Sequence, residues 1–267
     1  MRKKLATSLF LLMLVTSTFA SEKITILCTT THLSSIVQAL MQTHANVTTI
    51  IPYGMCPGHF DISPNEMKTL SQADLILYHG YERFIEDCKS EDRADSHYVE
   101  VIISGNWMIP QNNKKAAQKL AEILSASAPD LQSIVAQNLD IYLSRLTKLE
   151  ESIHDQISVL NQVPVLCAAM NEDLVNWLGA KVVATFPRDE DISLNAMRNI
   201  MVQTQNTGIE LVLDNLQSSG KVGRTFSDEL NVPFVMLSNF PQNNNYIKTL
   251  EELCTKIVMA LEKGKNE

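Results

Sequence analysis

The sequence predicts an α/β protein made of two βα lobes with parallel sheets, joined by one long backbone helix, with a ligand cleft between the lobes. Three observations predict this class. First, an alternation of β-rich and helix-like stretches occurs twice along the chain. Second, an uninterrupted helical pattern of about thirty residues separates the two copies. Third, neither copy contains a low-complexity segment. Strands that alternate with helices favour parallel sheets.

Residues 1–20 have the features of a secretory signal peptide. Positive charges at 2–4 precede an apolar run from Leu5 to Val15, and a small-residue exit ending at Ala20 follows. The run is too short for a membrane span, although a retained anchor is the alternative. We expect cleavage after Ala20 and export to the periplasm. Because no Cys stands just after the run, we expect a mature form that is not a lipoprotein.

The charge balance excludes some classes of partner. Three of the 22 Lys and Arg residues lie in the signal peptide, so the mature chain has 19 basic residues and 30 acidic residues, Asp and Glu. Such an acidic surface repels nucleic acid and anionic membranes. The apolar content of 45% predicts a well-cored globular protein, which we expect to be a monomer. The cysteine count of five is odd, so at least one thiol is free or engaged elsewhere. Spacing assigns no pairs, and we expect Cys88 and Cys254 either to pair or to stay buried.

The predicted N-terminal lobe covers residues 21–128. Helix-like stretches such as Leu33–Gln42 and Pro64–Gln72 separate four short β-rich runs. These runs are Lys23–Thr30, Val47–Gly54, Ala73–Gly80 and His97–Ile103.

The connecting helix is predicted over residues 129–163. No Gly or Pro occurs between Pro129 and Pro164, and apolar residues recur three or four apart, which is the period of one helix face. Pro129 suits the first turn of a helix, and Pro164 ends the pattern. At 1.5 Å per residue the helix would be roughly 45–50 Å long, which is more than one small domain is wide. We therefore expect it to span both lobes.

The predicted C-terminal lobe covers residues 164–267 and repeats the alternation. Its β-rich runs are Val165–Ala169, Val182–Pro187, Ile209–Asn215 and Phe234–Asn239, and its helix-like stretches are Glu172–Leu178, Ser193–Gln205 and Gly220–Leu230. In parallel sheets ligands bind outside the carboxyl ends of the strands, so the residues that follow each run are the candidate site.

Several stretches match one known family in chain order. They are ITILCTTTHLSSIVQAL, VTTIIPYGMCPGHFDISPNEMKTLSQADLILYHG, GNWMIPQNNKKAAQKLAEIL, LGAKVVATF and DELNVPFVMLSNF. Together they resemble the cluster A-I substrate-binding proteins of ABC transporters, the periplasmic family that binds zinc or manganese. The resemblance covers nearly all of the mature chain. It implies the two-lobe fold, a metal ion as cargo, and a membrane permease of an ABC transporter as the partner that receives it.

The usual metal ligands of that family, three histidines and a carboxylate, are replaced in this chain. The resemblance places the histidines at Gly58, Gly105 and near Ala168, and the carboxylate at Ser238. A family-type zinc or manganese site therefore does not carry over. We expect Mn²⁺ not to bind in the family manner.

Other metal-binding residues stand beside those positions. Cys56 and His59 flank Gly58, and Cys167 and Met170 flank Ala168. A set of Cys, His and Met side chains suits Zn²⁺ or Cu(I) and is poor for Mn²⁺. We therefore predict a metal-binding protein with an atypical soft site. The alternative is that these thiols and thioethers only pack in the core.

A second hypothesis keeps the fold and changes the ligand. Loss of two imidazoles and a carboxylate removes bulk and charge, so the pocket could take a small metal chelate or an organic solute. The candidate cleft residues are Tyr53, Gly58, Phe60, Gly105, Asn106, Trp107, Arg188, Asp214, Asn215 and Ser238.

Two further classes stay open. An enzyme would use the Cys56 thiol with His59 as its base, but no orienting third group is apparent. A structural or adhesive relative would have a cleft that binds nothing. His32 and His79 also follow strands and could reach the cleft, although we expect them to be solvated loop histidines.

Overall fold

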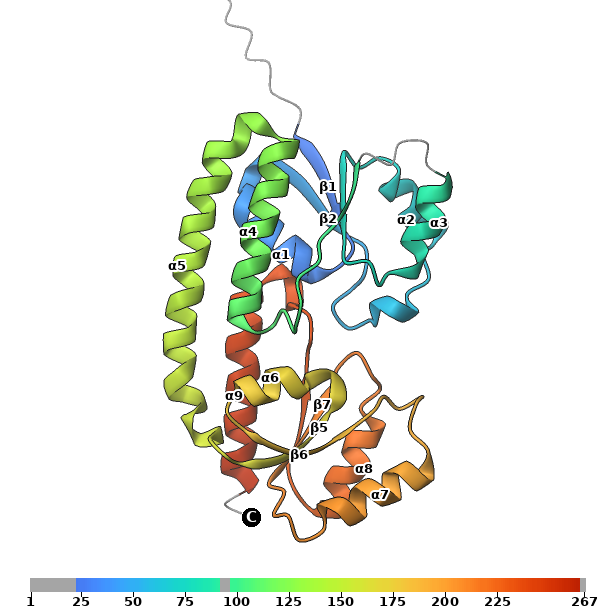
Figure 1. Ribbon diagram of the computed structural model, residues 1–267, viewed down its shortest axis with the longest axis vertical. Coiled ribbons are helices and arrows are strands. Elements are labelled where there is room, and N and C mark those ends of the chain that lie inside the picture. Colours follow the sequence, from blue (N-terminus) through green and yellow to red (C-terminus); the bar gives the residue numbers. More distant parts are fainter. Residues whose placement is uncertain (1–22, 92–96, 265–267) are drawn as a thin grey trace, which may run out of the picture.

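The computed structural model describes residues 23–91 and 97–264 and confirms the two-lobe α/β class (Figure 1). The predicted signal peptide, residues 1–20, lies outside the described residues. Each lobe holds a four-stranded parallel sheet, in the order β2-β1-β3-β4 in the N-terminal lobe and β6-β5-β7-β8 in the C-terminal lobe. The strands are β1 (Ile24–Cys28), β2 (Ala45–Thr49), β3 (Leu75–Tyr78), β4 (Tyr98–Glu100), β5 (Pro164–Ala168), β6 (Lys181–Phe186), β7 (Leu211–Asn215) and β8 (Phe234–Leu237).

Each predicted β-rich run overlaps one of these strands, and all pairings between neighbours are parallel. Six of the observed strands are shorter than the runs, mainly because the last residues of the runs leave the sheet as loops, whereas β5 and β6 are as long as predicted and begin one residue earlier. In the second run, for example, the strand ends at Thr49 and the residues up to Gly54 belong to the loop. These loops form the cleft.

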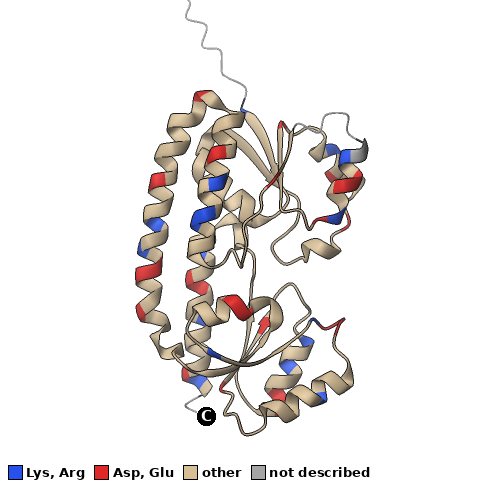
Figure 2. Ribbon diagram, viewed as in Figure 1, with Lys and Arg blue, Asp and Glu red and all other residues tan. Residues whose placement is uncertain are grey.

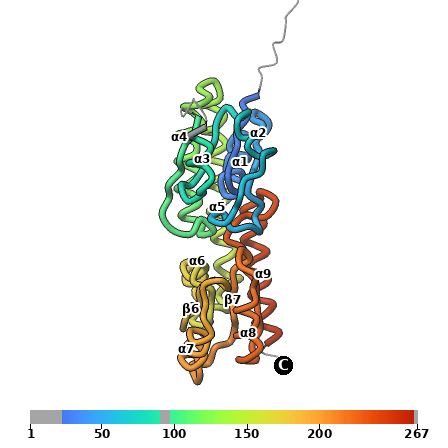
Figure 3. The backbone as a smooth tube through the Cα atoms, turned by 90° about the vertical axis from the view of Figure 1, so that its right-hand side faces the viewer, coloured from blue at the N-terminus to red at the C-terminus, as the bar shows by residue number. Residues whose placement is uncertain are grey.

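Helices cover the sheets and join the lobes. They are α1 (Thr31–Met41), α2 (Pro64–Leu70), α3 (Arg83–Glu91), α4 (Pro110–Ser127), α5 (Gln132–Ile157), α6 (Glu172–Trp177), α7 (Leu194–Thr204), α8 (Lys221–Leu230) and α9 (Tyr246–Gly264). Figure 1 shows α4, α5 and α9 together on the side of the molecule away from α2 and α3. Figure 3 shows that the two lobes follow each other along one long axis.

The predicted connecting helix is present as α5, with a 3-10 turn at each end, Pro129–Leu131 and Ser158–Leu160. The α-helical part is shorter than the predicted 129–163 because the first and last residues adopt these tighter turns. The side chains of Tyr142, Leu146 and Ile153 are buried and lie four and seven residues apart, as the apolar period predicts.

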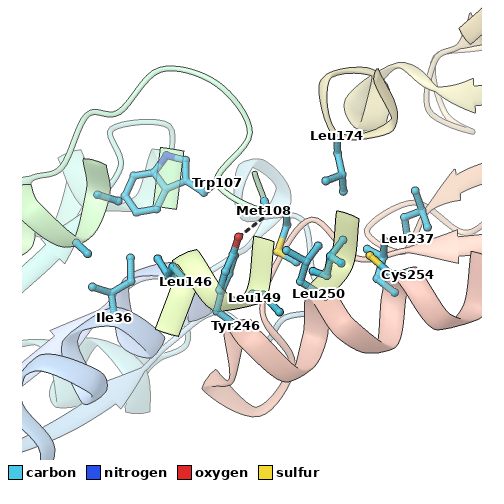
Figure 4. Close-up of a cluster of buried hydrophobic side chains, with 14 of the residues drawn as sticks. Ile36, Trp107, Met108, Leu146, Leu149, Leu174, Leu237, Tyr246, Leu250 and Cys254 are labelled. Carbon is cyan, nitrogen blue, oxygen red and sulfur yellow. Dashed lines mark hydrogen bonds between the residues drawn. The ribbon is translucent and has the colours of Figure 1, made fainter. Parts of the chain in front are cut away.

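A single hydrophobic cluster runs through both lobes and is centred on α5 (Figure 4). It takes in Ile36 and Leu146 toward the N-terminal lobe and Leu237 toward the C-terminal lobe. Fully burying one such aliphatic side chain contributes about 1.5–3 kcal/mol. The buried hydroxyl of Tyr246 donates a hydrogen bond of 2.8 Å to the carbonyl of Met108, which ties α9 to the N-terminal lobe.

The C-terminal segment adds a connection that the sequence pattern did not reveal. After β8 the chain reaches α1 through the 3-10 turn Gln242–Asn244, where the Ser34 hydroxyl donates to Asn244 Oδ1 at 2.7 Å. It then returns along α5 as α9. The two lobes are therefore fixed to each other by packing along α4, α5 and α9, and not by α5 alone.

Charged residues of both signs are spread along α4 and α5 (Figure 2). Lys114 and Glu150 form an ion pair between these two helices. No helix within residues 23–91 and 97–264 combines the length and apolarity that a bilayer span requires.

Candidate ligand-binding cleft

A cleft of about 740 Å³ lies between the lobes. All eight strand exits contribute to its lining, as the rule for parallel sheets predicts. The lining consists of His32, Cys56, Pro57, Gly58, His59, His79, Tyr81, Arg83, Val101, Ile102, Ile103, Gly105, Asn106, Trp107, Ala169, Met170, Asp173, Arg188, Asn215, Gln217, Asn239 and Phe240.

The loop after β2 brings Cys56 and His59 to the cleft together. Residues Pro57–His59 form a 3-10 turn that begins with proline, and Cys56 precedes it with extended backbone. The Cys56 thiol is partly exposed and His59 is exposed. Both side chains are therefore accessible to a ligand.

Arg188 reaches these two residues from the opposite lobe. Its Nη1 lies 2.9 Å from Cys56 Sγ and 3.5 Å from His59 Nδ1. Glu190 Oε1 lies 3.7 Å from both Arg188 Nη1 and His59 Nδ1. The predicted ligand pair is thus in contact with a cation across the cleft.

The loop that carries Arg188 is anchored at the start of α8. The Asp189 carboxylate accepts hydrogen bonds from the backbone N–H groups of Lys221 at 3.2 Å and Val222 at 3.4 Å, and from the Ser219 hydroxyl. A carboxylate is stabilised at this end of a helix by the unpaired N–H groups and the helix dipole. Arg188 is therefore held in place over the cleft.

Of the other predicted metal ligands, Met170 lines the cleft and Cys167 does not. Met170 lies on the 3-10 turn Ala169–Asn171 and is 52% exposed. The side chain of Cys167 lies in the hydrophobic cluster around α5, because neighbouring residues of a strand point to opposite faces of the sheet. Burial raises the pKa of this thiol to about 12, which keeps it protonated.

No group of three or more His, Cys, Asp or Glu side chains in the described ranges is arranged to hold a metal ion.

Cys167 and Cys254 are both free, buried thiols, so the pairing considered for Cys254 does not occur.

The four positions where the resemblance places family ligands differ in their surroundings. A Cβ added at Gly58 would meet only Cys56 Sγ, at 3.9 Å, so there is room for a side chain. Gly105 has φ +87°, and its Cβ would lie 2.7 Å from Asn112 Nδ2. Ala168 is the last residue of β5, is buried, and lies outside the cleft lining.

Asp214 and Ser238 also lie outside the lining. The Asp214 carboxylate accepts hydrogen bonds from the backbone N–H of Asn215 at 2.6 Å and of Gly223 at 3.0 Å. Burial raises its pKa, although these hydrogen bonds oppose the rise. The Ser238 hydroxyl donates to the carbonyl of Phe240 at 2.7 Å. Both side chains therefore shape the strand exits rather than face a ligand.

Two more of the cleft residues named in the second hypothesis, Phe60 and Tyr53, are absent from the lining of the cleft. Phe60 packs edge-on against Phe84 in the core of the N-terminal lobe. Tyr53 contributes its carbonyl to Gln217, which lines the cleft from the other lobe. The remaining candidates, Gly58, Gly105, Asn106, Trp107, Arg188 and Asn215, do line the cleft.

His32 and His79 were expected to be solvated, and that expectation is wrong. They are 4% and 9% exposed, and both pack against Trp107 with ring centroids 5.6 and 4.7 Å away. Phe240, from the other lobe, lies 5.1 Å from His32. Burial lowers the pKa of His32 to about 3 and that of His79 to well below its usual value, so both are neutral.

Each buried histidine has a fixed hydrogen-bond partner. His32 Nε2 lies 2.7 Å from the carbonyl of Asn239, so this nitrogen carries the proton, and the buried Nδ1 has no partner among the described residues. His79 Nε2 lies 2.8 Å from the hydroxyl of Thr30, and the buried Glu82 carboxylate accepts the His79 backbone N–H. The one sequence signal for these sites was a polar residue immediately after a buried strand.

Asn239 links the two lobes at the cleft. Besides the bond from His32, its Oδ1 accepts from Asn106 Nδ2 at 3.1 Å and its Nδ2 donates to the Met170 carbonyl at 3.2 Å. Its backbone N–H donates to Gln217 Oε1 at 3.1 Å. The lobes therefore meet through a polar network beside the aromatic residues.

Two parallel-sheet lobes, a rigid helical frame and a cleft lined by every strand exit define the class of bilobal substrate-binding proteins. The model of one such family, described as the periplasmic component A of the zinc-uptake complex (ZnuA), matches residues 26–260. The chain belongs to this family, whose members include substrate-binding proteins of metal ABC transporters.

The chain is also similar to individual curated proteins. A Rickettsia prowazekii protein, RP014, is 26% identical over 174 residues, covering 61% of this chain and 58% of the relative. The manganese ABC transporter substrate-binding lipoprotein scaA of Streptococcus gordonii is 24% identical over 170 residues, 54% of each chain. The chain thus spans a little over half the length of the curated relatives it matches. A crystal structure of ZnuA superposes with a TM-score of 0.77 at 16% identity, over 90% of this chain and all of that one, which supports the fold.

Proposed function

We propose that this protein is the extracytoplasmic substrate-binding component of an ABC transporter, which captures a transition metal in the cleft between its lobes and presents it to a membrane permease. The observation that carries the proposal is the convergence of all eight strand exits on one cleft in a metal-transporter family fold. The name of the relative scaA describes the same role, with manganese as its cargo. We propose that this chain acts in the periplasm as a monomer.

A binding role fits the cleft better than catalysis. Cys56 Sγ contacts Arg188, and the nearest groups to His59 Nδ1 are Arg188 and Glu190. A catalytic thiol requires a base within hydrogen-bond reach that is itself oriented by a third group. The structure gives Cys56 a guanidinium partner instead.

The groups that can contact the metal are Cys56 and His59 from one lobe and Met170 from the other. Thiolate, imidazole and thioether ligands suit Cu(I) or Zn²⁺. Ligands from both lobes would couple metal binding to the relative position of the lobes. Cys167 takes no part in this proposal because its side chain faces the core.

The position of Arg188 restricts the charge of the metal. A zinc ion about 2.3 Å from Cys56 Sγ would lie close to a guanidinium whose Nη1 is 2.9 Å from the same sulfur. Two unit charges about 4 Å apart repel by roughly 4 kcal/mol at an effective dielectric constant of 20. A dication would feel about twice that repulsion. Cu(I) is therefore tolerated better than Zn²⁺ unless Arg188 moves or an anion accompanies the metal.

The test replaces the two anchors singly, as Cys56→Ser and His59→Ala. Stoichiometry and affinity for Cu(I) and Zn²⁺ are measured by competition titration under reducing conditions. Each change is expected to weaken binding at least tenfold, about 1.4 kcal/mol. The control is His154→Ala, which removes an exposed imidazole on α5 outside the cleft.

Metal binding displaces the thiol proton of Cys56, so affinity should fall as the pH is lowered. Tight binding that neither anchor variant weakens would place the metal elsewhere. A wild-type protein that binds no metal in any form would refute the proposal.

A further inference from the structure

The charged groups around the cleft include a guanidinium from each lobe. Arg188 and Arg83 line it from opposite lobes, and Asp173 is the one carboxylate among the described lining residues. His32 and His79 are neutral because burial lowers their pKa values. Glu190 lies 3.7 Å from Arg188 Nη1, so guanidinium and carboxylate groups are equal in number around the cleft. An anionic ligand would therefore be held by direct contact with a guanidinium and not by the net charge of the cleft.

Arg188 has unused hydrogen-bonding capacity on the cleft. Within the residues that the structure describes, its contacts with Cys56, His59 and Glu190 all involve Nη1. The Nε–H and Nη2–H groups therefore remain for another acceptor. A guanidinium binds a carboxylate through two parallel N–H donors, which is the strongest arrangement available to it. The anchoring of Asp189 at α8 holds the guanidinium in place for such a ligand.

The size and wall of the cleft fit an organic ligand. A metal ion with six waters occupies about 180 Å³, at roughly 30 Å³ per water, against about 740 Å³ here. Trp107, His79 and Tyr81 form an aromatic wall, in which His79 and Tyr81 stack at 4.9 Å with an interplanar angle of 7°. Open space at Gly58 adds room beside Cys56. Ligand sites are commonly concave, largely apolar and supplied with a few placed polar groups.

We propose that the metal enters this cleft as a low-molecular-weight anionic chelate, whose carboxylate binds Arg188 while the metal faces Cys56 and His59. The inference rests on the proposed function, since it names the form in which the metal is captured. A carboxylate on Nε and Nη2 balances the guanidinium charge that disfavours a bare ion. The chelator fills space that a lone ion leaves to solvent.

The first test isolates the full mature chain from its own compartment and measures the mass of the bound species by native mass spectrometry, with elemental analysis of the metal. The expected increment exceeds that of the metal by the mass of an organic acid. An increment equal to the metal alone overturns the inference and leaves the proposed function intact. Absence of metal, both here and after reconstitution, overturns both.

The second test compares three probes by calorimetry: Zn²⁺ alone, Zn²⁺ with excess citrate, and citrate alone. The complex is expected to bind at least tenfold more tightly than either component. Arg188→Gln should weaken binding of the complex at least tenfold without weakening binding of Zn²⁺ alone, and Arg188→Lys should recover only part of the loss. The matched control is Arg145→Gln, an exposed residue of α5 with the same change of charge.

Equal affinity for Zn²⁺ with and without citrate, in a chain that carries no organic mass when isolated, overturns the inference. The inference is also overturned if the Arg188→Gln variant binds the Zn²⁺–citrate complex as tightly as wild type. Thermal unfolding of each variant checks that it is folded.

Discussion

Acidification should destabilise the protein through the two buried histidines. His32 and His79 are neutral in the folded state, with the pKa of His32 lowered to about 3 and that of His79 to well below its usual value by burial. The unfolded chain binds a proton at each histidine near pH 6.5. The stability that these residues contribute is therefore complete above pH 6.5 and is lost as the pH falls toward their folded-state pKa values.

The size of the effect follows from the difference in bound protons. At pH 5 the pH is about 1.5 units below the pKa of an unfolded histidine, while folded His32 has not yet titrated, which costs about 2 kcal/mol between pH 7.5 and pH 5. For a chain of this size that corresponds to roughly 4–8 °C of melting temperature. His79 adds a cost in the same direction, because burial lowers its pKa as well.

The assay is urea unfolding at pH 7.5 and pH 5.0 on wild type, His32→Gln and His79→Gln. Carboxylates contribute their own pH dependence to every protein, so the informative quantity is the difference between each variant and wild type. His32→Gln is expected to reduce the loss of stability on acidification by about 2 kcal/mol, and His79→Gln is expected to reduce it in the same direction. His154→Gln, which alters an exposed histidine, should leave the loss unchanged. If the cleft variants lose as much stability as wild type, the two histidines titrate normally and are not held neutral.

Two further outcomes are expected. Gly105→Ala should cost more than about 1 kcal/mol, because its positive φ is strained for any other residue, whereas Gly58→Ala should stay within about 0.5 kcal/mol, as urea unfolding would show. Mn²⁺ should not bind in the family manner, since the described residues offer no three-ligand group, and submicromolar affinity in calorimetry at neutral pH would contradict this.

Much of the fold could be predicted because it depends on local patterns. The period of α5, the alternation of strands and helices, and the turn residues after each strand are all visible in one pass along the sequence. These features also located the strand exits, and with them Cys56, His59, Met170 and Arg188 at the cleft. The rule that ligands bind at these exits needed no knowledge of distant contacts.

What could not be predicted depends on side-chain direction and on contacts between distant residues. Cys167 ends in the core because its register in β5 points it toward α5, and a shift of one residue would have turned it to the other face. The burial of His32 requires Phe240, more than two hundred residues away, and Trp107. The contact of Arg188 with Cys56 joins loops of different lobes. Hydrophobic periodicity carries no information about such pairs.

The two glycines at positions where the resemblance places family ligands differ in how they would accept a histidine. At Gly58 a side chain has room, so we expect a histidine there to be accommodated. At Gly105 the backbone itself has φ +87° and the Cβ direction leads into Asn112, so a histidine would force the loop and its neighbour to rearrange. Even a restored first ligand would lie beside Arg188, whose anchored guanidinium opposes a dication.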